Sequence, residues 1–171
     1  MREPNPVSSM TRPQLREFRW RTDRDAVLGF QTEIYEINFP GFRMNPGFLR
    51  DYEQQIRQAL RHPSEHLMVL EDDEGLCGFL WVALINTMVE PFVGYIKNIY
   101  VAPRLRGRGY GRMLLAAADQ WFRSRGCTKA SLDASTCNAR AVSIYETAGY
   151  QAVRLRMEKP LSDDPTTESG W

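Results

Sequence analysis

The sequence predicts an α+β protein in which a mixed central sheet of six to seven strands carries helices on both faces. Two segments in the middle of the chain, Leu76–Ile85 and Phe92–Val101, are almost continuous in apolar residues, as expected for strands covered on both sides. Segments with helical apolar spacing precede and follow them. A chain of 171 residues can bury a core without disulfides or metals.

The first half of the chain predicts a strand and two helices. Residues 15–20 alternate in polarity and predict the strand. Thr22 or Asp23 can cap the first helix, and Phe39–Phe42, with its proline and glycine, ends it. Asn45 caps the second helix, which has a proline at its first position. The apolar faces of the two helices are Ala26, Val27, Phe30, Ile34 and Ile37, then Phe48, Leu49, Tyr52, Ile56 and Leu60.

The second half predicts strands alternating with helices. The turn Asp72–Gly75 joins the strand His66–Leu70 to the first long apolar strand as a hairpin. The later elements are a helix over 109–125 ended by Gly126, a strand over 128–134, a helix over 138–148 and a last strand over 150–158. The longer helix should bury Met113, Leu114, Ala117, Trp121 and Phe122. One domain over 14–159 is expected between flexible segments 1–13 and 160–171.

Composition excludes several function classes. The 22 basic and 21 acidic residues nearly cancel, which argues against a general nucleic-acid binder. No apolar run reaches the length of a membrane span, and the first residues do not form a signal peptide, so no membrane association is expected. Cys77, Cys127 and Cys137 predict buried or free thiols in a reducing compartment, with the cytoplasm as the expected location. No metal site is expected, since His62 and His66 are separated by Pro63.

The most informative stretch is Arg106–Arg112, which follows the strand pattern and opens a helical one. Glycines let a backbone approach a ligand closely, and free N–H groups at a helix start point at phosphate. Four arginines add positive charge: Arg104, Arg106, Arg108 and Arg112. The stretch therefore predicts a site for a ligand that contains a pyrophosphate.

The glycine spacing distinguishes between ligands. A phosphate-binding P-loop would need a lysine and a hydroxyl after the glycines, and in a dinucleotide fingerprint the third glycine would come one residue later. The remaining pattern, Arg106, Gly109 and Gly111, resembles the acyl-CoA pyrophosphate loop of the GNAT superfamily of N-acetyltransferases. The flanking segments Asn98–Pro103 and Asn138–Tyr150 resemble conserved blocks of the same family. The resemblance is specific over residues 93–159.

The resemblance implies the GNAT fold and an acetyl-CoA site in which the sheet splays open after its fourth strand. The implied cofactor-binding residues are Ile99, Tyr100 and Val101 on the strand, Arg106, Gly107, Arg108, Gly109, Tyr110, Gly111 and Arg112 in the loop, and Asn138 and Tyr145 beyond it. Backbone groups of Ile99 and Val101 would bond the pantetheine, and one N–H could face the acetyl oxygen. Asn138 would bond the pantetheine arm and cap its helix. Arg104 or Arg140 could reach the 3′-phosphate.

The resemblance also implies an acetyltransferase that moves the acetyl group of acetyl-CoA to a primary amine by direct attack. Tyr145 matches the tyrosine that protonates the departing thiolate as a general acid. The pKa of a thiol is ~8.5 and that of a phenol ~10, so geometry must supply most of this effect. Some members carry a glutamate base where this chain has Tyr95. The base is left open between Glu33, Glu36, Glu90 and water.

The sequence leaves open both the identity of the amine acceptor and the oligomeric state. The pocket is expected from the loop Asn38–Asn45, the turn Asn86–Pro91 and the last strand, with Phe39, Phe42, Met44, Met88 and Phe92 as apolar members. A small molecule or a peptide amine would fit equally, and the donor could be acetyl or a longer acyl group. Family members often form homodimers. A CoA-responsive regulatory module with little turnover is the alternative function, ahead of a nucleotide-binding protein.

Overall fold

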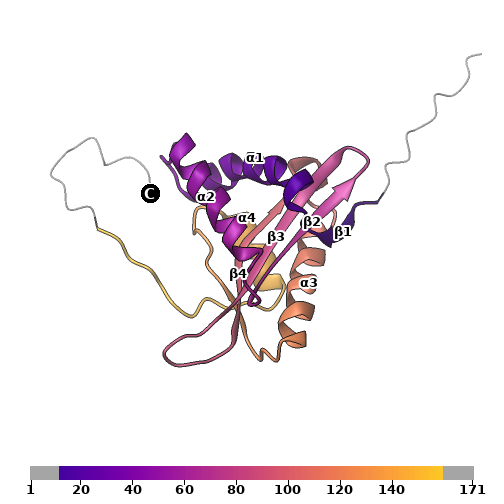
Figure 1. The fold of residues 1–171 in the computed structure, drawn as a ribbon. Helices are drawn as coiled ribbons and strands as arrows, with labels where there is room; N and C mark the ends of the chain where they lie inside the picture. Colours follow the sequence, from indigo (N-terminus) through magenta and orange to yellow (C-terminus); the bar gives the residue numbers. More distant parts are fainter. Residues whose placement is uncertain (1–11, 160–171) are drawn as a thin grey trace, which may run out of the picture.

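The computed structural model describes residues 12–159 and contains one mixed sheet with helices on both faces, which confirms the predicted fold class (Figure 1). The strands follow the order β1 (Gln14–Glu17), β2 (Glu65–Asp72), β3 (Gly75–Ile85), β4 (Val93–Val101) and β5 (Ala130–Leu132). Neighbouring strands are antiparallel except for β4 and β5, which are parallel. The helices are α1 (Trp20–Asn38), α2 (Pro46–Ala59), the 3₁₀ turn η1 (Pro103–Leu105), α3 (Tyr110–Ser124) and α4 (Ala139–Thr147).

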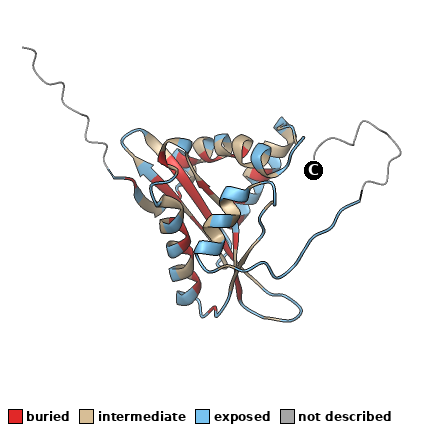
Figure 2. Cartoon of the chain, turned by 180° about the vertical axis from the view of Figure 1, so that it is seen from behind, coloured by how far each residue is buried: buried red, intermediate tan, exposed pale blue. Residues whose placement is uncertain are grey.

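Two hydrophobic cores lie on opposite faces of the sheet. Helices α1 and α2 cover one face, and α3 and α4 cover the other (Figures 1 and 2). The first core joins Val27 and Ile56 of the helices to Phe79 and Trp81 of β3. The second packs Leu114, Leu115, Ala118 and Phe122 of α3 on Leu80, Val82 and Ile96 of the sheet. The sheet is therefore buried on both sides, as its apolar strands predicted.

Helix α1 begins earlier than predicted and is not capped by Thr22 or Asp23. It starts at Trp20, and Asp23, inside the first turn, accepts a 2.7 Å hydrogen bond from the Arg19 N–H and a 2.7 Å bond from Arg16 of β1. Burial alone would raise the pKa of Asp23, but the hydrogen bonds from Arg16, Arg19 and Thr22 outweigh it and lower that pKa below its usual value. Asp23 thus ties β1 to α1.

The cap of α2 is confirmed, because the Asn45 side chain accepts a 2.9 Å bond from the Phe48 N–H. Tyr52 and Ile56 are buried as predicted, whereas Leu60 is 42% exposed because the helix ends before it. On α3 the buried residues Leu115 and Ala118 replace the predicted Met113, Ala117 and Trp121, which are only partly buried. Phe122 fixes α3 against β4, since a Cβ at Gly94 would lie 2.4 Å from its ring.

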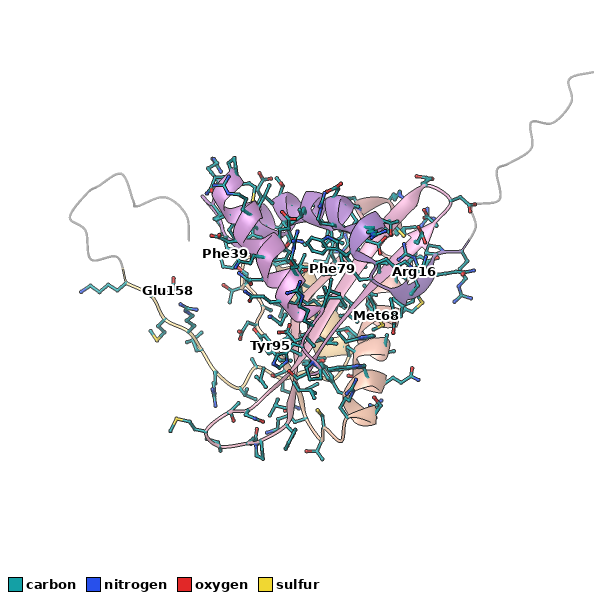
Figure 3. All side chains as sticks on the ribbon, in the orientation of Figure 1. Arg16, Phe39, Met68, Phe79, Tyr95 and Glu158 are labelled. Carbon is teal, nitrogen blue, oxygen red and sulfur yellow. The ribbon has the colours of Figure 1, made fainter. Side chains whose placement is uncertain are left out.

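The predicted last strand over 150–158 is wrong. Residues 150–159 belong to no strand, and after Tyr150 they leave the body of the protein as an extended segment that carries Glu158 (Figures 1 and 3). Val153, Leu155 and Met157 are 85%, 77% and 85% exposed. The sheet ends at five strands rather than six or seven because β5 has only three residues and offers little edge to pair with. The predicted flexible segments lie outside the described residues, apart from Arg12 and the buried Pro13.

Candidate active site

The sheet opens where the cofactor site was expected. Strand β5 pairs with β4 only at Gly94, Tyr95 and Ile96, while β4 continues to Val101. The last five residues of β4 therefore have a strand neighbour on one side only. We call the open side, along Lys97–Val101, the slot.

A one-residue bulge in β4 marks the start of the slot. On β3, Trp81 faces Asn98 and the next residue, Val82, faces Ile96, so Lys97 is an extra residue without a partner of its own. A bulge of this kind reverses which edge of the strand the following backbone groups face. The side chains of Lys97 and Asn98 consequently both lie on the α1–α2 face. There the Lys97 Nζ is 4.1 Å from the centre of the Trp81 ring.

The bulge turns the backbone of Ile99 and Val101 toward the slot. Before the bulge, the Gly94 N–H donates toward β5, to the Lys129 carbonyl. If the two-residue period continued, the Ala102 N–H would face the same side, yet it donates to a β3 carbonyl at 2.9 Å. After the bulge, the backbone groups of Ile99 and Val101 therefore face the slot. This is the orientation that the predicted pantetheine contacts require.

The glycine-rich loop forms a cluster of backbone donors at the end of the slot. Gly107 and Gly109 have φ values of 79° and 89°, in the left-handed region that glycine adopts without strain. Gly109 precedes α3, and the N–H groups of residues 108–112 have no backbone partner among the described residues. Such N–H groups at a helix N-terminus attract an anion. Arg108 and Arg112, both exposed, add charge to it.

The arginines near the loop have different surroundings. Arg104 donates to both oxygens of Asp72, at 2.5 and 2.8 Å, and is thereby held on the β2–β3 turn. Arg140 of α4 lies close to the loop, with its Nη2 4.0 Å from where a Cβ of Gly107 would be. Of the two predicted 3′-phosphate partners, only Arg140 has its guanidinium at the loop.

Arg106 turns toward α1 rather than out of the loop. Its Nε donates to the Val101 carbonyl at 2.9 Å, and its Nη2 donates to the Glu33 carboxylate. The Tyr100 hydroxyl donates to the other Glu33 oxygen at 2.6 Å. Burial and the Glu33 carboxylate raise the pKa of Tyr100, so it remains a donor at neutral pH. In this arrangement Arg106 binds the end of β4 to α1, and a contact with pyrophosphate stays a prediction.

Asn138 lies at the N-terminus of α4, where its Oδ1 accepts from the Ala141 N–H at 3.1 Å as the predicted cap. Its Nδ2 donates to Asn38 Oδ1 at 3.1 Å, which links α4 to the end of α1. Tyr145 is half-buried against Tyr150, with ring centres 6.1 Å apart. Its hydroxyl makes no hydrogen bond to another described residue, and burial raises its pKa. It is therefore a protonated hydroxyl with a free donor.

The candidate bases are not equivalent. Glu33 is held by Arg106 and Tyr100, and Glu90 is paired with Lys129 on the turn before β4. Glu36 is exposed. Tyr95 donates to Asp133 at 2.8 Å beside the slot, and burial together with that carboxylate raises the pKa of Tyr95 to about 12. No local pattern points to Asp133, because its partner lies 38 positions earlier in the chain.

The α1–α2 face of the site is aromatic. The ring of Tyr35 lies 5.3 Å from Phe39, 5.3 Å from Phe42 and 4.5 Å from Phe48, measured between ring centres. Phe39 is 54% exposed at the edge of this cluster. The predicted pocket residues Phe39 and Phe42 are thus brought together. The β3–β4 turn exposes the others, Met88 and Phe92, and Met44 is partly buried.

A polar network lies on the same face. Asn98 Nδ2 donates to Gln31 Oε1 at 3.2 Å and to the Tyr52 hydroxyl at 2.9 Å. Gln31 is fully buried, and burial raises the pKa of Tyr52 far above its usual value. This network could not be predicted from the sequence, because its members belong to α1, α2 and β4 and a single polar residue in each pattern has no local signature.

Other reactive groups are outside this site. His66 stacks on Trp121, and the described residues contain no group of three or more His, Cys, Asp or Glu that could hold a metal. Cys77 and Cys127 are buried and Cys137 is exposed, and all three are free thiols, as expected. Across residues 12–159, every helix is too short or too polar to cross a membrane.

A mixed sheet that opens after β4, with a bare helix N-terminus at the end of the opening, defines the class of acyl-CoA-dependent transferases. The family comparison agrees: the model of the Acetyltransferase (GNAT) family matches residues 31–150. The chain belongs to this family. It is therefore an acetyltransferase, and acetyl-CoA is the co-substrate that the family membership assigns to it.

Similar proteins support the assignment. An aminoglycoside N(6')-acetyltransferase type 1 of Klebsiella aerogenes is 28% identical over 124 residues, which are 67% of this chain and 82% of that protein. The uncharacterized N-acetyltransferase YycN of Bacillus subtilis (strain 168) is 34% identical over 109 residues, 62% of this chain and 68% of its own. A predicted acetyltransferase from Clostridium acetobutylicum, solved with acetyl-CoA, has a TM-score of 0.73 at 19% identity and covers 88% of this chain and 97% of its own. This last likeness shows the fold alone.

Proposed function

We propose that the chain transfers the acetyl group of acetyl-CoA to a primary amine of a small molecule or peptide by direct attack of the amine on the thioester. The observation that carries the proposal is the slot, in which the backbone groups of Ile99 and Val101 lead to the free N–H groups of the glycine-rich loop. An extended pantetheine arm can pair with such an edge as a strand would. The loop then lies where a pyrophosphate would follow.

In this proposal the pyrophosphate binds the N–H groups of residues 108–112, and Arg108 and Arg112 supply charge. Arg140 approaches the 3′-phosphate from α4. Asn138 exchanges its bond to Asn38 for one to the pantetheine arm and keeps its cap. Arg106 acts through Val101 and Glu33, to which its Nε and Nη2 donate.

The reaction needs an oxyanion donor, a proton donor for the thiolate and a proton acceptor for the amine. The Ile99 N–H faces the slot and serves the oxyanion of the tetrahedral intermediate. Tyr145 protonates the leaving thiolate, because its hydroxyl is protonated and has no partner among the described residues. The amine proton leaves through water to Glu36 or Asp133, two acidic groups that carry no salt bridge among the described residues.

The acceptor class is a primary amine on a small molecule with an apolar or ring-shaped body. The aromatic cluster around Tyr35 offers ring surfaces beside the slot, and ring stacking adds to apolar burial. The 28% identical relative named for aminoglycoside acetylation favours an amino sugar as the first compound to test. Peptide amines form the second group.

Thermal unfolding with acetyl-CoA, ADP or NADH tests the cofactor, and thiol release with an amine panel tests the transfer. Acetyl-CoA at 100 times its dissociation constant adds about 2.7 kcal/mol, a shift of about 5–11 °C for a domain of this size. A shift with acetyl-CoA alone, followed by amine-dependent thiol release, is expected. An equal shift with ADP would overturn the cofactor site, and a shift without thiol release would favour a CoA-responsive regulatory module.

A further inference from the structure

One buried polar atom beside the slot has no hydrogen-bond partner. The side-chain oxygen of Asn98 is buried and unpaired among the described residues, although the amide nitrogen of the same side chain makes two bonds. Buried carbonyl oxygens are normally paired, so an orphan in a functional region requires an explanation. Asn98 as a whole is only partly buried, so other atoms of the residue reach the surface beside this buried oxygen.

The orientation of the Asn98 amide is fixed by its neighbours. Gln31 Nε2 donates to the Val27 carbonyl at 2.8 Å, and a backbone carbonyl can only accept. Gln31 must therefore direct its Oε1 toward Asn98, and the Asn98 Nδ2 donates to that oxygen. A flipped Asn98 would place two oxygens about 3.2 Å apart. The orphan oxygen is thus a built feature of the network.

The position of Asn98 relates this oxygen to the reaction. Asn98 precedes Ile99, whose backbone faces the slot, while its own side chain lies on the α1–α2 face. The glycine-rich loop and α3 approach the slot from the opposite face. A cofactor bound there leaves only the α1–α2 face for the incoming amine. On that face β4 presents Lys97, Asn98 and Tyr100. Lys97 is paired with Glu65 and Tyr100 with Glu33, whereas the Asn98 oxygen has no partner among the described residues.

We propose that Asn98 is a specificity-determining residue: its Oδ1 accepts an N–H of the acceptor amine and selects primary over secondary amines. The inference rests on the proposed function. A neutral primary amine has two N–H bonds; when its nitrogen attacks the thioester carbon, one proton is lost and the other stays in the amide product. Asn98 holds the N–H that stays. An N-methyl amine must lose its single N–H, so it cannot keep this bond. Gln31 is a positioning residue that fixes the amide.

The experiment compares a primary amine with its N-methyl derivative on the full chain, using the best acceptor from the thiol-release panel. With wild type, the primary amine should have the higher kcat/KM. In Asn98→Ala the KM for the primary amine should rise about tenfold, as expected for one lost hydrogen bond. The KM for acetyl-CoA should stay within about twofold, and the preference for the primary amine should disappear.

Two further variants separate this role from a structural one. Tyr52→Phe removes one partner of the amide nitrogen and leaves the oxygen and Gln31 in place, so the preference should remain. Gln31→Met frees the amide to rotate, so the preference should fall part of the way. Each variant must keep the acetyl-CoA shift in thermal unfolding. An intact preference in Asn98→Ala, or equal loss of preference in Tyr52→Phe, overturns the assignment. A wild-type chain that binds acetyl-CoA but acetylates no amine refutes the proposed function itself.

Discussion

The two faces of the sheet present two kinds of binding surface. On the α3–α4 face the site is built mainly on backbone groups from one continuous stretch, residues 93–112, to which α4 adds side chains. On the α1–α2 face it is made of side chains from three separate elements, among them Gln31, Tyr52 and Asn98. A backbone surface depends on dihedral angles, whereas a side-chain surface depends on packing. The cofactor side should therefore respond to glycine substitutions and the acceptor side to changes in side chains.

The largest expected effect is at Tyr145, a side chain on the cofactor side that the proposed reaction requires. Tyr145→Phe should lower kcat about 100-fold, as for loss of a general acid, with the acetyl-CoA shift in thermal unfolding retained. Burial raises the pKa of Tyr145, so its protonated form persists to higher pH. Deprotonation of Tyr145 should therefore not lower the kcat of the wild type at any pH below about 10. Tyr150→Phe, at the neighbouring ring, serves as the control. A kcat for Tyr145→Phe within threefold of wild type would remove the proposed role.

A pair of glycine variants tests the difference between the faces directly. Gly109 and Gly41 have φ values of 89° and 86°, and an added Cβ would meet no atom within 4 Å at either position. Valine should strain both backbones alike, by about 1–3 kcal/mol. Gly109→Val should raise the KM for acetyl-CoA about tenfold or more, while Gly41→Val, in the loop after α1, should affect only the amine. Steady-state kinetics with each substrate varied in turn would show the separation, and identical profiles would contradict it.

The smallest effect should separate Arg106 from Arg108. Arg108 is exposed, so Arg108→Ala should raise the KM for acetyl-CoA a few-fold, more at low than at high salt. Arg106→Ala leaves Glu33 without its cation and the Val101 carbonyl without its donor. It should lower the melting temperature and show a weaker salt dependence. A salt dependence larger for Arg106 than for Arg108 would restore Arg106 as a direct pyrophosphate ligand.

Much of the cofactor side could be predicted from the sequence. Three central strands, the glycine-rich loop and the α3 start are local patterns, and each formed at its predicted place within a few residues. The Asn45 and Asn138 caps were predicted for the same reason, since a cap depends on residues only three positions away. The arginines were harder. Their charge was visible, but the partners that hold Arg104 and Arg106 lie 32 and 73 positions away.

The wrong and missing predictions share one physical cause: the pattern of a segment does not show which distant residues will contact it. Residues 150–158 alternate like a strand, but a strand needs an edge, and the short β5 supplies too little of one. Asn98 looks like an ordinary polar residue within a strand until α1 and α2 surround it. The sequence leaves the general base open for the same reason, since Arg106 and Tyr100, which hold Glu33, are distant from it in the chain.

The extra residue Lys97 has a consequence for the glycine-rich loop that follows it. A strand has a parity, and one inserted residue exchanges its odd and even positions. If β4 paired with β3 through Lys97 without the bulge, every letter of the loop would be unchanged. Ile99 and Val101 would nevertheless turn their backbone groups to β3 and present those of Tyr100 to the slot. The loop pattern would still be present in the sequence, but the strand before it would no longer offer the backbone groups of Ile99 and Val101 to a pantetheine arm. A match to the loop therefore identifies a working cofactor site only when the strand before it has the correct parity.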